Sequence, residues 1–260
     1  MKYFIVSDVH GFYDELIKGL EEVGFDSSNP EHIFVSLGDL FDRGDKSYEC
    51  LQFVNGLTNK ILICGNHENC MQDAILRKHF KSYDSHNKTD KTCWEFYKHS
   101  HPDEEISDVS ETDVLRWLET YDDLNKYFGC LKDYHIIGNN IFVHGWVPYW
   151  CRTIADVKRA DWVDWYDAVW ENGASCWYNY GKIKTDDSEF ARVVTVFCGH
   201  VHSWFANHKY HHSGVVEFIP ETNDVKTELL DNKPFIDDGI VNLDSYTRAT
   251  HNVNVYILEI

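Results

Sequence analysis

The chain is organised around the stretch Gly38-Asp39-Leu40-Phe41-Asp42-Arg43-Gly44. It follows the run 33–37, whose branched and aromatic side chains are typical of a buried strand. Gly38 lets the chain turn away, and Asp39 then stands at the edge where open α/β sheets hold their ligands. One short turn later, Asp42 offers an orienting carboxylate and Arg43 offers a fork of donors that suits phosphate. The stretch predicts a binding site if other polar groups reach the same edge.

Length and composition predict a single soluble domain. The 260 residues fit one large domain, residues 1–260, and the 43% hydrophobic content suffices for a substantial core. The formal net charge of -19 disfavours binding to nucleic acid or anionic membranes, because that attraction depends on Lys and Arg. An anionic substrate would need a locally positive site, which bound metal cations can supply.

The cysteines and the apolar runs indicate the compartment. The 8 Cys residues include no CxxC pair, so we expect reduced, buried thiols. Residues 1–6 are too short for the apolar core of a signal peptide, and no run approaches the ~20 apolar residues of a membrane span. We therefore expect a cytoplasmic protein.

The first strand ends in two potential ligands. Residues 3–6 predict a buried strand, which Asp8 and His10 follow. Side chains two apart in an extended chain share a face, so this carboxylate and imidazole can form half of a metal site. The alternative is a plain turn that carries both residues by chance. Helical stripes over 13–23 and 48–57 complete a strand–helix alternation typical of a layered α/β domain.

The third strand, expected over 60–64, repeats this pattern. It opens into Gly65-Asn66-His67-Glu68, where Asn66 offers an amide oxygen suited to a divalent ion. His67 is adjacent and so points elsewhere, which suits a group that faces substrate without touching metal. Asn66 could instead be a simple helix cap. Polar residues after three consecutive strands argue against that interpretation.

The second half of the chain adds three histidines after strands. A hairpin over 134–143 leads into His144, and a strand over 193–197 is followed by His200 and His202, again two apart. The chain closes with further expected strands over 215–219, 239–243 and 253–260.

Two segments between the motifs differ in character. Residues 70–133 are highly charged, with a helix expected over 112–128, and we interpret them as a mostly helical insertion that is a lid or a surface elaboration. Residues 146–180 are rich in aromatic side chains, which either pack in the core or line a groove and stack on a base. Helical spacing favours core packing for Trp162, Trp165 and Val169. Two arginines of this segment could reach a phosphate: Arg152 and Arg159.

Collected, the residues after the strands form one donor set: Asp8, His10, Asp39, Asn66, His144, His200 and His202. Oxygen and nitrogen donors without thiolate suit two divalent ions such as Mn, Fe or Zn better than a structural zinc. Two ions need a bridging ligand, and a carboxylate fits that role. Such ions lie ~3.5–4 Å apart, share a water-derived nucleophile and clamp a phosphoryl group.

Five ordered motifs resemble those of the calcineurin-like metallophosphoesterases: Asp8-Val9-His10-Gly11, Gly38-Asp39 to Asp42-Arg43-Gly44, Gly65-Asn66-His67-Glu68, His144-Gly145 and Gly199-His200-x-His202. The DRG and NHE forms look most like the serine/threonine phosphoprotein phosphatase branch, including its bacterial and phage members. The resemblance spans residues 8–202. It implies an α/β fold, a four-layer αββα sandwich with two mixed β-sheets, here carrying a helical insertion.

The resemblance also implies the site. One metal ion would be held by Asp8, His10 and Asp39, with His202 as a further candidate. The other would be held by Asp39, Asn66, His144 and His200, with Mn the expected metal and Fe or Zn the alternatives. Arg43 would bind phosphate, and His67, oriented by Asp42, would protonate the leaving alkoxide, a step that can supply ~10²–10⁴-fold.

The leading functional hypothesis is a phosphatase for phosphate monoesters, including phosphoserine or phosphothreonine in proteins, by attack of a metal-bridging hydroxide. The alternative is a hydrolase of dinucleoside polyphosphates, whose bases the aromatic segment would stack. The expected partner is thus a phosphoprotein or a nucleotide. A nuclease is disfavoured because no basic groove is visible. A non-enzymatic scaffold would lack a ligand or His67, and none is missing.

Overall fold

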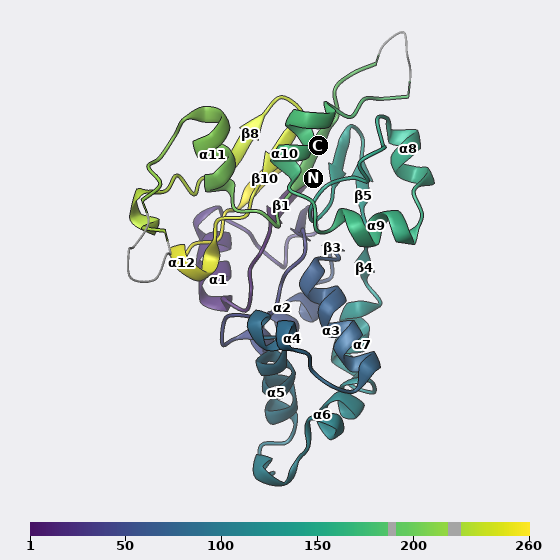
Figure 1. Ribbon diagram of the computed structural model, residues 1–260, viewed down its shortest axis with the longest axis vertical. Coiled ribbons are helices and arrows are strands. Elements are labelled where there is room, and N and C mark those ends of the chain that lie inside the picture. The colour runs from purple at the N-terminus through teal and green to yellow at the C-terminus, as the bar shows by residue number, and fades with distance from the viewer. Residues whose placement is uncertain (187–190, 218–224) are drawn as a thin grey trace.

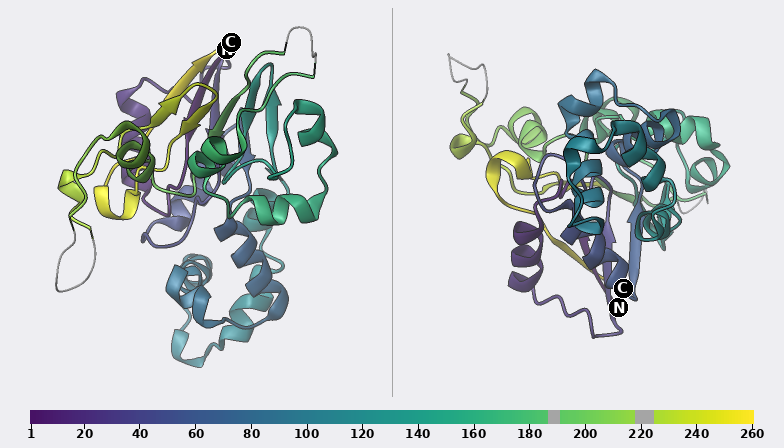
Figure 2. Two further views of the ribbon diagram at one scale, coloured as in Figure 1. Left: turned by 45° about the horizontal axis from the view of Figure 1, so that its top comes forward. Right: turned by 90° about the horizontal axis from the view of Figure 1, so that it is seen from below.

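The computed structural model describes residues 1–186, 191–217 and 225–260. Within these residues, two mixed β-sheets of five strands each lie face to face (Figures 1 and 2). The strands of the first sheet are β1 (Lys2–Val6), β2 (His32–Ser36), β3 (Lys60–Ile63), β4 (Leu131–Lys132) and β10 (Tyr256–Glu259). Their order is β10-β1-β2-β3-β4, in which β1 to β4 run parallel and β10 is antiparallel to β1.

The second sheet has three parallel strands flanked by antiparallel ones. Its strands are β5 (His135–Ile137), β6 (Asn140–Phe142), β7 (Thr195–Cys198), β8 (Phe235–Asp237) and β9 (Ile240–Asn242). Their order is β5-β6-β7-β9-β8, and β6, β7 and β9 are the parallel ones. The carboxyl ends of these parallel strands, like those of β1, β2 and β3, lead into the motifs.

An apolar layer of side chains separates the sheets. Because successive side chains of a strand alternate between faces, Tyr3 and Ile5 of β1 point to the second sheet while Phe4 joins the helix-side core. The second sheet contributes Phe142 and Phe197, whose rings are stacked with centroids 5.1 Å apart. Both faces of β1 are thus covered, which explains its continuous apolar sequence.

Helices flank both sheets, and most of those in the segment 70–133 lie below the sheets in Figure 1. Those on the side of the first sheet are α1 (Tyr13–Glu22), α2 (Ser47–Gly56), α3 (Asn66–Arg77), α4 (Ser82–Asn87), α5 (Thr89–Ser100), α6 (Glu111–Leu118) and α7 (Asp122–Phe128), with a short 3₁₀ turn over Ile106–Asp108. Those on the side of the second sheet are α8 (Ile154–Arg159), α9 (Trp162–Ala168), α10 (Gly173–Tyr180) and α11 (Ser203–His211). The 3₁₀ turn Thr227–Leu229 and α12 (Thr247–Thr250) precede β10. The expected αββα sandwich with two mixed sheets is confirmed.

The segment 70–133 contains most of the helical residues that gather below the sheets in Figure 1, where α2 packs against α5 and α7. The single helix predicted over 112–128 is wrong in detail, because the chain forms α6 and α7 instead. Tyr121 adopts an extended conformation between them, and its ring stacks on that of Trp117 with centroids 4.5 Å apart. One helix therefore ends at Leu118 and another begins at Asp122.

Other differences concern strands and one aromatic residue. Residues 218–219 of the strand predicted over 215–219 lie outside the described residues, and 215–217 are not in a strand. The strand β8 is not among the predicted strands, although it pairs with β9 across the turn at Asp238 and Gly239. Trp165 and Val169 are buried as expected, whereas Trp162 is 75% exposed. Among the described helices, none has the length and apolar character needed to cross a membrane.

Candidate metal centre

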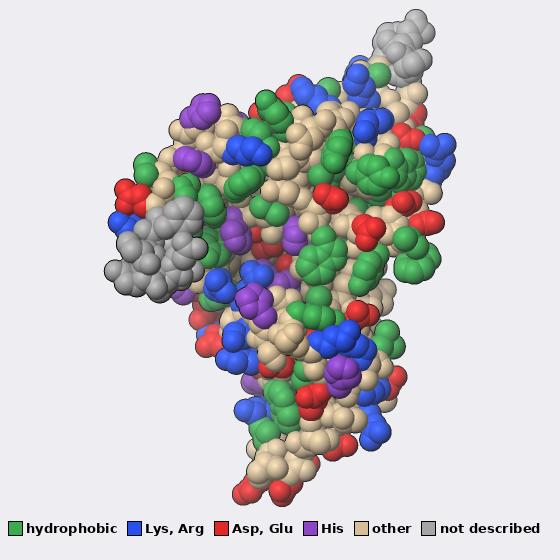
Figure 3. All heavy atoms as spheres, in the orientation of Figure 1, with side chains coloured by type: hydrophobic (Ala, Val, Ile, Leu, Met, Phe, Trp, Pro, Cys, Tyr) green, Lys and Arg blue, Asp and Glu red, His purple; other side chains and the backbone are tan. Residues whose placement is uncertain are grey.

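The predicted ligands gather at the edge where the parallel strands end. They follow the strands in order: Asp8 and His10 after β1, Asp39 after β2, Asn66 after β3, His144 after β6, and His200 and His202 after β7. Figure 3 shows a hollow in the middle of this face, in which histidine and acidic side chains lie. Both sheets therefore supply donors to one place.

Backbone strain is concentrated in the same loops. Six residues have a positive φ between 52° and 74°: Asp8, His10, Asp39, Asp42, Arg43 and His200. Each such conformation costs a non-glycine residue ~1–3 kcal/mol and persists only where its surroundings enforce it. The loops also pack backbone to backbone, since a Cβ on Gly65 would lie 2.6 Å from the amide nitrogen of Asp39. This is why glycine stands at position 65.

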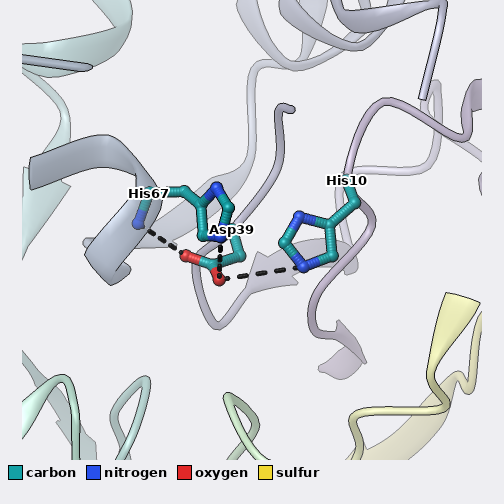
Figure 4. A group of neighbouring side chains, drawn as sticks. All are labelled: His10, Asp39 and His67. Atoms are coloured by element: carbon teal, nitrogen blue, oxygen red, sulfur yellow. Dashed lines mark hydrogen bonds and ion pairs between the residues drawn. The ribbon is translucent and has the colours of Figure 1, made fainter. Parts of the chain in front are cut away.

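The Asp39 carboxylate faces two groups of donors at once. Its Oδ2 lies 3.8 Å from Nε2 of His10 and 3.8 Å from Nε2 of His67 (Figure 4). Its Oδ1 lies 3.4 Å from Nε2 of His144 and accepts a hydrogen bond from the backbone N–H of His67. One group is His10, Asp39 and His67, and the other is Asp39, His144 and His200. A carboxylate placed between two donor groups can bridge two ions.

Asn66 completes the second group. Its Oδ1 lies 2.9 Å from Nε2 of His144 and 2.8 Å from Nδ1 of His200. Donors that share one ion at ~2.0–2.2 Å are themselves ~3.0–3.4 Å apart, so these separations are close to those of a formed site. The chemistry and the spacing of this group therefore fit a divalent metal ion.

Hydrogen bonds fix which nitrogen of each imidazole faces the site. Nδ1 of His144 lies 2.7 Å from the carbonyl oxygen of Leu37, and Nδ1 of His10 lies 3.1 Å from that of Phe41. A carbonyl only accepts, so each Nδ1 carries the proton and donates it. In both residues Nε2 is then the nitrogen that faces the site, where a metal ion would take the place of a proton.

Asp8 is buried beside this first group. Its Oδ2 accepts hydrogen bonds from Ser7 Oγ and from the backbone N–H of His200, leaving Oδ1 4.0 Å from Nε2 of His10. Burial, with the nearby Asp244 carboxylate, raises the pKa of Asp8 to about 7. Burial opposes a charge on His144, yet Asp39 beside it raises the pKa of His144 to about 10. Several carboxylates are buried together here, and buried negative charges repel one another unless positive charge compensates them. Two metal ions would provide that charge.

His202 lies apart from both groups. Its Nδ1 is 2.8 Å from Oδ2 of Asp244, and its ring stacks on that of Tyr246 with centroids 4.0 Å apart. Burial disfavours the charged carboxylate, but the His202 contact lowers the pKa of Asp244 to about 2. Sequence reasoning missed Asp244, although it follows β9 just as the other acids follow their strands.

His67 is held by a buried carboxylate behind it. Its Nδ1 lies 2.6 Å from Oδ2 of Asp42, and that oxygen also accepts a hydrogen bond from Thr89 Oγ1 at 2.6 Å. Nη2 of Arg43 lies 3.2 Å from Nε2 of His67. Burial lowers the pKa of His67, but Asp39 and Asp42 outweigh it and raise the pKa overall. Thr89 belongs to α5, so no motif indicated its contribution.

Glu68 ties the loops of the site together. Its Oε2 accepts from the backbone N–H groups of Asp39 and Gly65, each at 2.9 Å. Its Oε1 accepts from the N–H of Leu40 at 3.0 Å and from the hydroxyl of Tyr127 at 3.1 Å. The sequence contained Glu68 in a motif but indicated no role for it. The structure shows a buried acid that positions the loop of Asp39.

The sequence of this chain matches a known protein family over most of its length. A family profile described as calcineurin-like phosphoesterase matches residues 1–204. The chain belongs to this family. The resemblance seen in the sequence motifs is thereby confirmed, and the fold with its donor groups is that of a calcineurin-like phosphoesterase.

Two curated relatives match shorter parts of this phosphoesterase. A symmetrical bis(5'-nucleosyl)-tetraphosphatase of Actinobacillus succinogenes is 46% identical over 69 residues, which are 26% of this chain and 24% of the relative. The asymmetrical bis(5'-nucleosyl)-tetraphosphatase PrpE of Bacillus subtilis is 41% identical over 78 residues, 26% of this chain and 32% of the relative. The match spans about a quarter to a third of the length of these relatives.

Among solved structures, the cold-active protein-tyrosine phosphatase of a psychrophilic Shewanella species superposes with a TM-score of 0.54. The match covers 99% of this phosphoesterase and 75% of that chain, at 17% sequence identity. At this identity the likeness concerns the fold alone.

Proposed function

We propose that this phosphoesterase hydrolyses dinucleoside polyphosphates such as diadenosine tetraphosphate. The observation that carries the proposal is the similarity to two bis(5'-nucleosyl)-tetraphosphatases at 46% and 41% identity. This similarity supports the alternative derived from the sequence better than the leading hypothesis of phosphomonoester hydrolysis. In the reaction, water adds to one phosphorus while a phosphoanhydride bond breaks, releasing two nucleotides and a proton.

We assign the metal ligands from the two donor groups. One ion would be held by Asp39, Asn66, His144 and His200, and the other by Asp8, His10 and Asp39. His67 of the first group is assigned to the substrate, and His202, which lies beside Asp244 outside both groups, is a further candidate ligand. The absence of thiolate favours Mn, with Fe or Zn as alternatives. When bound, the ions supply Lewis acidity and an activated water.

Other residues of the chain bind and orient the substrate. Arg43 presents its guanidinium beside Nε2 of His67, so both can contact one phosphoryl group. Asp42 accepts the proton on Nδ1 of His67 in a hydrogen bond and so holds the ring with Nε2 toward the site. A protonated Nε2 can then donate to the oxygen that leaves. The buried ring of His67 also excludes water from this side.

The test compares substrates on the Mn-loaded protein. We expect a higher kcat/KM for diadenosine tetraphosphate than for a phosphoserine peptide, with nucleotide products resolved by chromatography. Chelation should abolish the activity, and added Mn should restore it. Turnover of the peptide alone would overturn the proposal in favour of a phosphomonoesterase. If neither substrate is turned over, both the dinucleotide hydrolase and the phosphomonoesterase hypotheses are overturned.

A further inference from the structure

Trp170 is an exposed indole placed against a proposed metal ligand. Its ring is nearly perpendicular to that of His200, with centroids 5.9 Å apart. The residue is nevertheless 47% exposed, whereas Trp146 and Trp165 of the same aromatic segment are each 2% exposed. In Figure 3, hydrophobic side chains border the hollow that contains the histidine and acidic groups. Trp170 therefore contacts the site through His200 while much of its surface stays available.

The backbone that carries Trp170 is rigidly mounted beside the site. Its N–H donates to the carbonyl of Asp167 at 3.1 Å, which closes a turn directly after α9. The N–H of Trp146 donates to the carbonyl of Ala168 at 3.1 Å and fastens this turn to the loop that follows His144. A Cβ on Gly145 would lie 2.5 Å from that same carbonyl oxygen. Glycine at position 145 thus lets the loop after His144 pack closely against the end of α9. This packing places Trp170, two residues after Ala168, beside the site.

A rigid, half-exposed indole is well suited to recognise a flat aromatic group. Purine bases stack on aromatic side chains, and truncating such a side chain typically weakens binding by roughly 5- to 100-fold per base. The contact with His200 and the hydrogen-bonded backbone restrict this residue before a ligand binds, which reduces the conformational entropy lost on stacking. Phosphoserine and phosphothreonine have no flat group that could use this surface.

We propose that Trp170 stacks on one base of the substrate and selects nucleotides over simple phosphate esters. This inference rests on the proposed function, since it takes the substrate to be a dinucleoside polyphosphate whose phosphates lie at the metal centre. Trp170 is a binding residue in this proposal and takes no part in proton transfer.

The experiment measures binding separately from turnover. A methylene-bridged, non-hydrolysable analogue of diadenosine tetraphosphate and inorganic tetraphosphate are titrated into the Mn-loaded protein by calorimetry. Trp170→Ala should raise the Kd of the analogue roughly 5- to 100-fold, because only the analogue has a base. The Kd of inorganic tetraphosphate should stay within about twofold of the wild-type value. Trp170→Phe should restore most of the affinity. Trp162→Ala is the matched control, since Trp162 is exposed at 75% on the same helical segment.

Each outcome decides between the two proposals. Equal weakening of both ligands by Trp170→Ala would mean that the indole positions His200, and it would overturn stacking. Unchanged affinity for the analogue would overturn it as well. If the wild-type protein hydrolyses diadenosine tetraphosphate in either case, the proposed function survives. If it binds the analogue through Trp170 but hydrolyses no dinucleotide, stacking survives and the proposed function fails.

Discussion

Replacing Glu68 by Gln tests whether one buried acid holds the loops of the site. The carboxylate accepts four hydrogen bonds, two on each oxygen. A glutamine has one carbonyl oxygen, so two of the four donors would face its NH₂ group. Losing two hydrogen bonds to a charged group costs ~3–6 kcal/mol, a large part of the ~5–15 kcal/mol by which a domain is stable. We expect the free energy of unfolding to fall by this amount.

The assay is urea unfolding followed by tryptophan fluorescence on chelator-treated protein, which separates folding from metal binding. Tyr127→Phe removes one of the four donors and should cost about 1 kcal/mol. Glu22→Gln is the control, because Glu22 is solvent-exposed and its pairing with Lys18 is a surface contact at 3.9 Å. A loss of less than about 1 kcal/mol for Glu68→Gln, or one equal to that of the control, would refute the reasoning.

Four further substitutions test other parts of the structure. His67→Ala should lower the rate on glycerol phosphate by ~10²–10⁴-fold with unchanged metal content, and the rate on diadenosine tetraphosphate less, because a nucleotide leaves more readily than an alkoxide. Asp39→Asn should remove both metal ions by elemental analysis, whereas Asn66→Ala should remove one. Burial, with Glu49 and Asp45 nearby, raises the pKa of Glu95 from 4.5 to about 7. The folded protein therefore holds a proton on Glu95 more tightly than the unfolded chain does. The resulting contribution to the free energy of unfolding is full below pH 4.5 and is lost as the pH rises to about 7. In urea unfolding from pH 5 to 8, wild type should lose about 1–2 kcal/mol relative to Glu95→Gln, after discounting for solvent exposure.

Each of these expectations can fail on its own. Loss of metal from the His67→Ala protein would make His67 a ligand. Two ions retained by Asp39→Asn would exclude a bridging carboxylate. Parallel pH profiles for wild type and Glu95→Gln would show that Glu95 titrates normally.

Much of the site could be predicted because its residues follow a local rule. Asp8, Asp39, Asn66, His144 and His200 each come directly after a buried strand, and parallel strands bring their carboxyl ends to one edge. The rule depends on hydrophobic periodicity and glycine positions, which are visible in the sequence.

The contacts that orient these residues could not be predicted in the same way. Thr89 reaches Asp42 from α5, and Tyr127 reaches Glu68 from α7, across separations of 47 and 59 residues. Such pairings depend on how the helices pack, and no local pattern reports them. The break between α6 and α7 could not be predicted either, since Trp117 and Tyr121 lie at helical spacing and nothing local indicates the extended backbone at Tyr121.

The layer between the sheets has a consequence for metal choice. Asp39 and Asn66 come from the first sheet, while His144 and His200 come from the second. The side chains between the sheets therefore act as a spacer that sets the distance between the two halves of the ligand set. Phe142 and Phe197, two and three residues before those histidines, are part of this spacer. On the proposed ligand assignment, substituting these two phenylalanines with smaller residues should change the size of the ion that fits without altering any ligand. Metal selectivity would then depend on the hydrophobic core as well as on the donors.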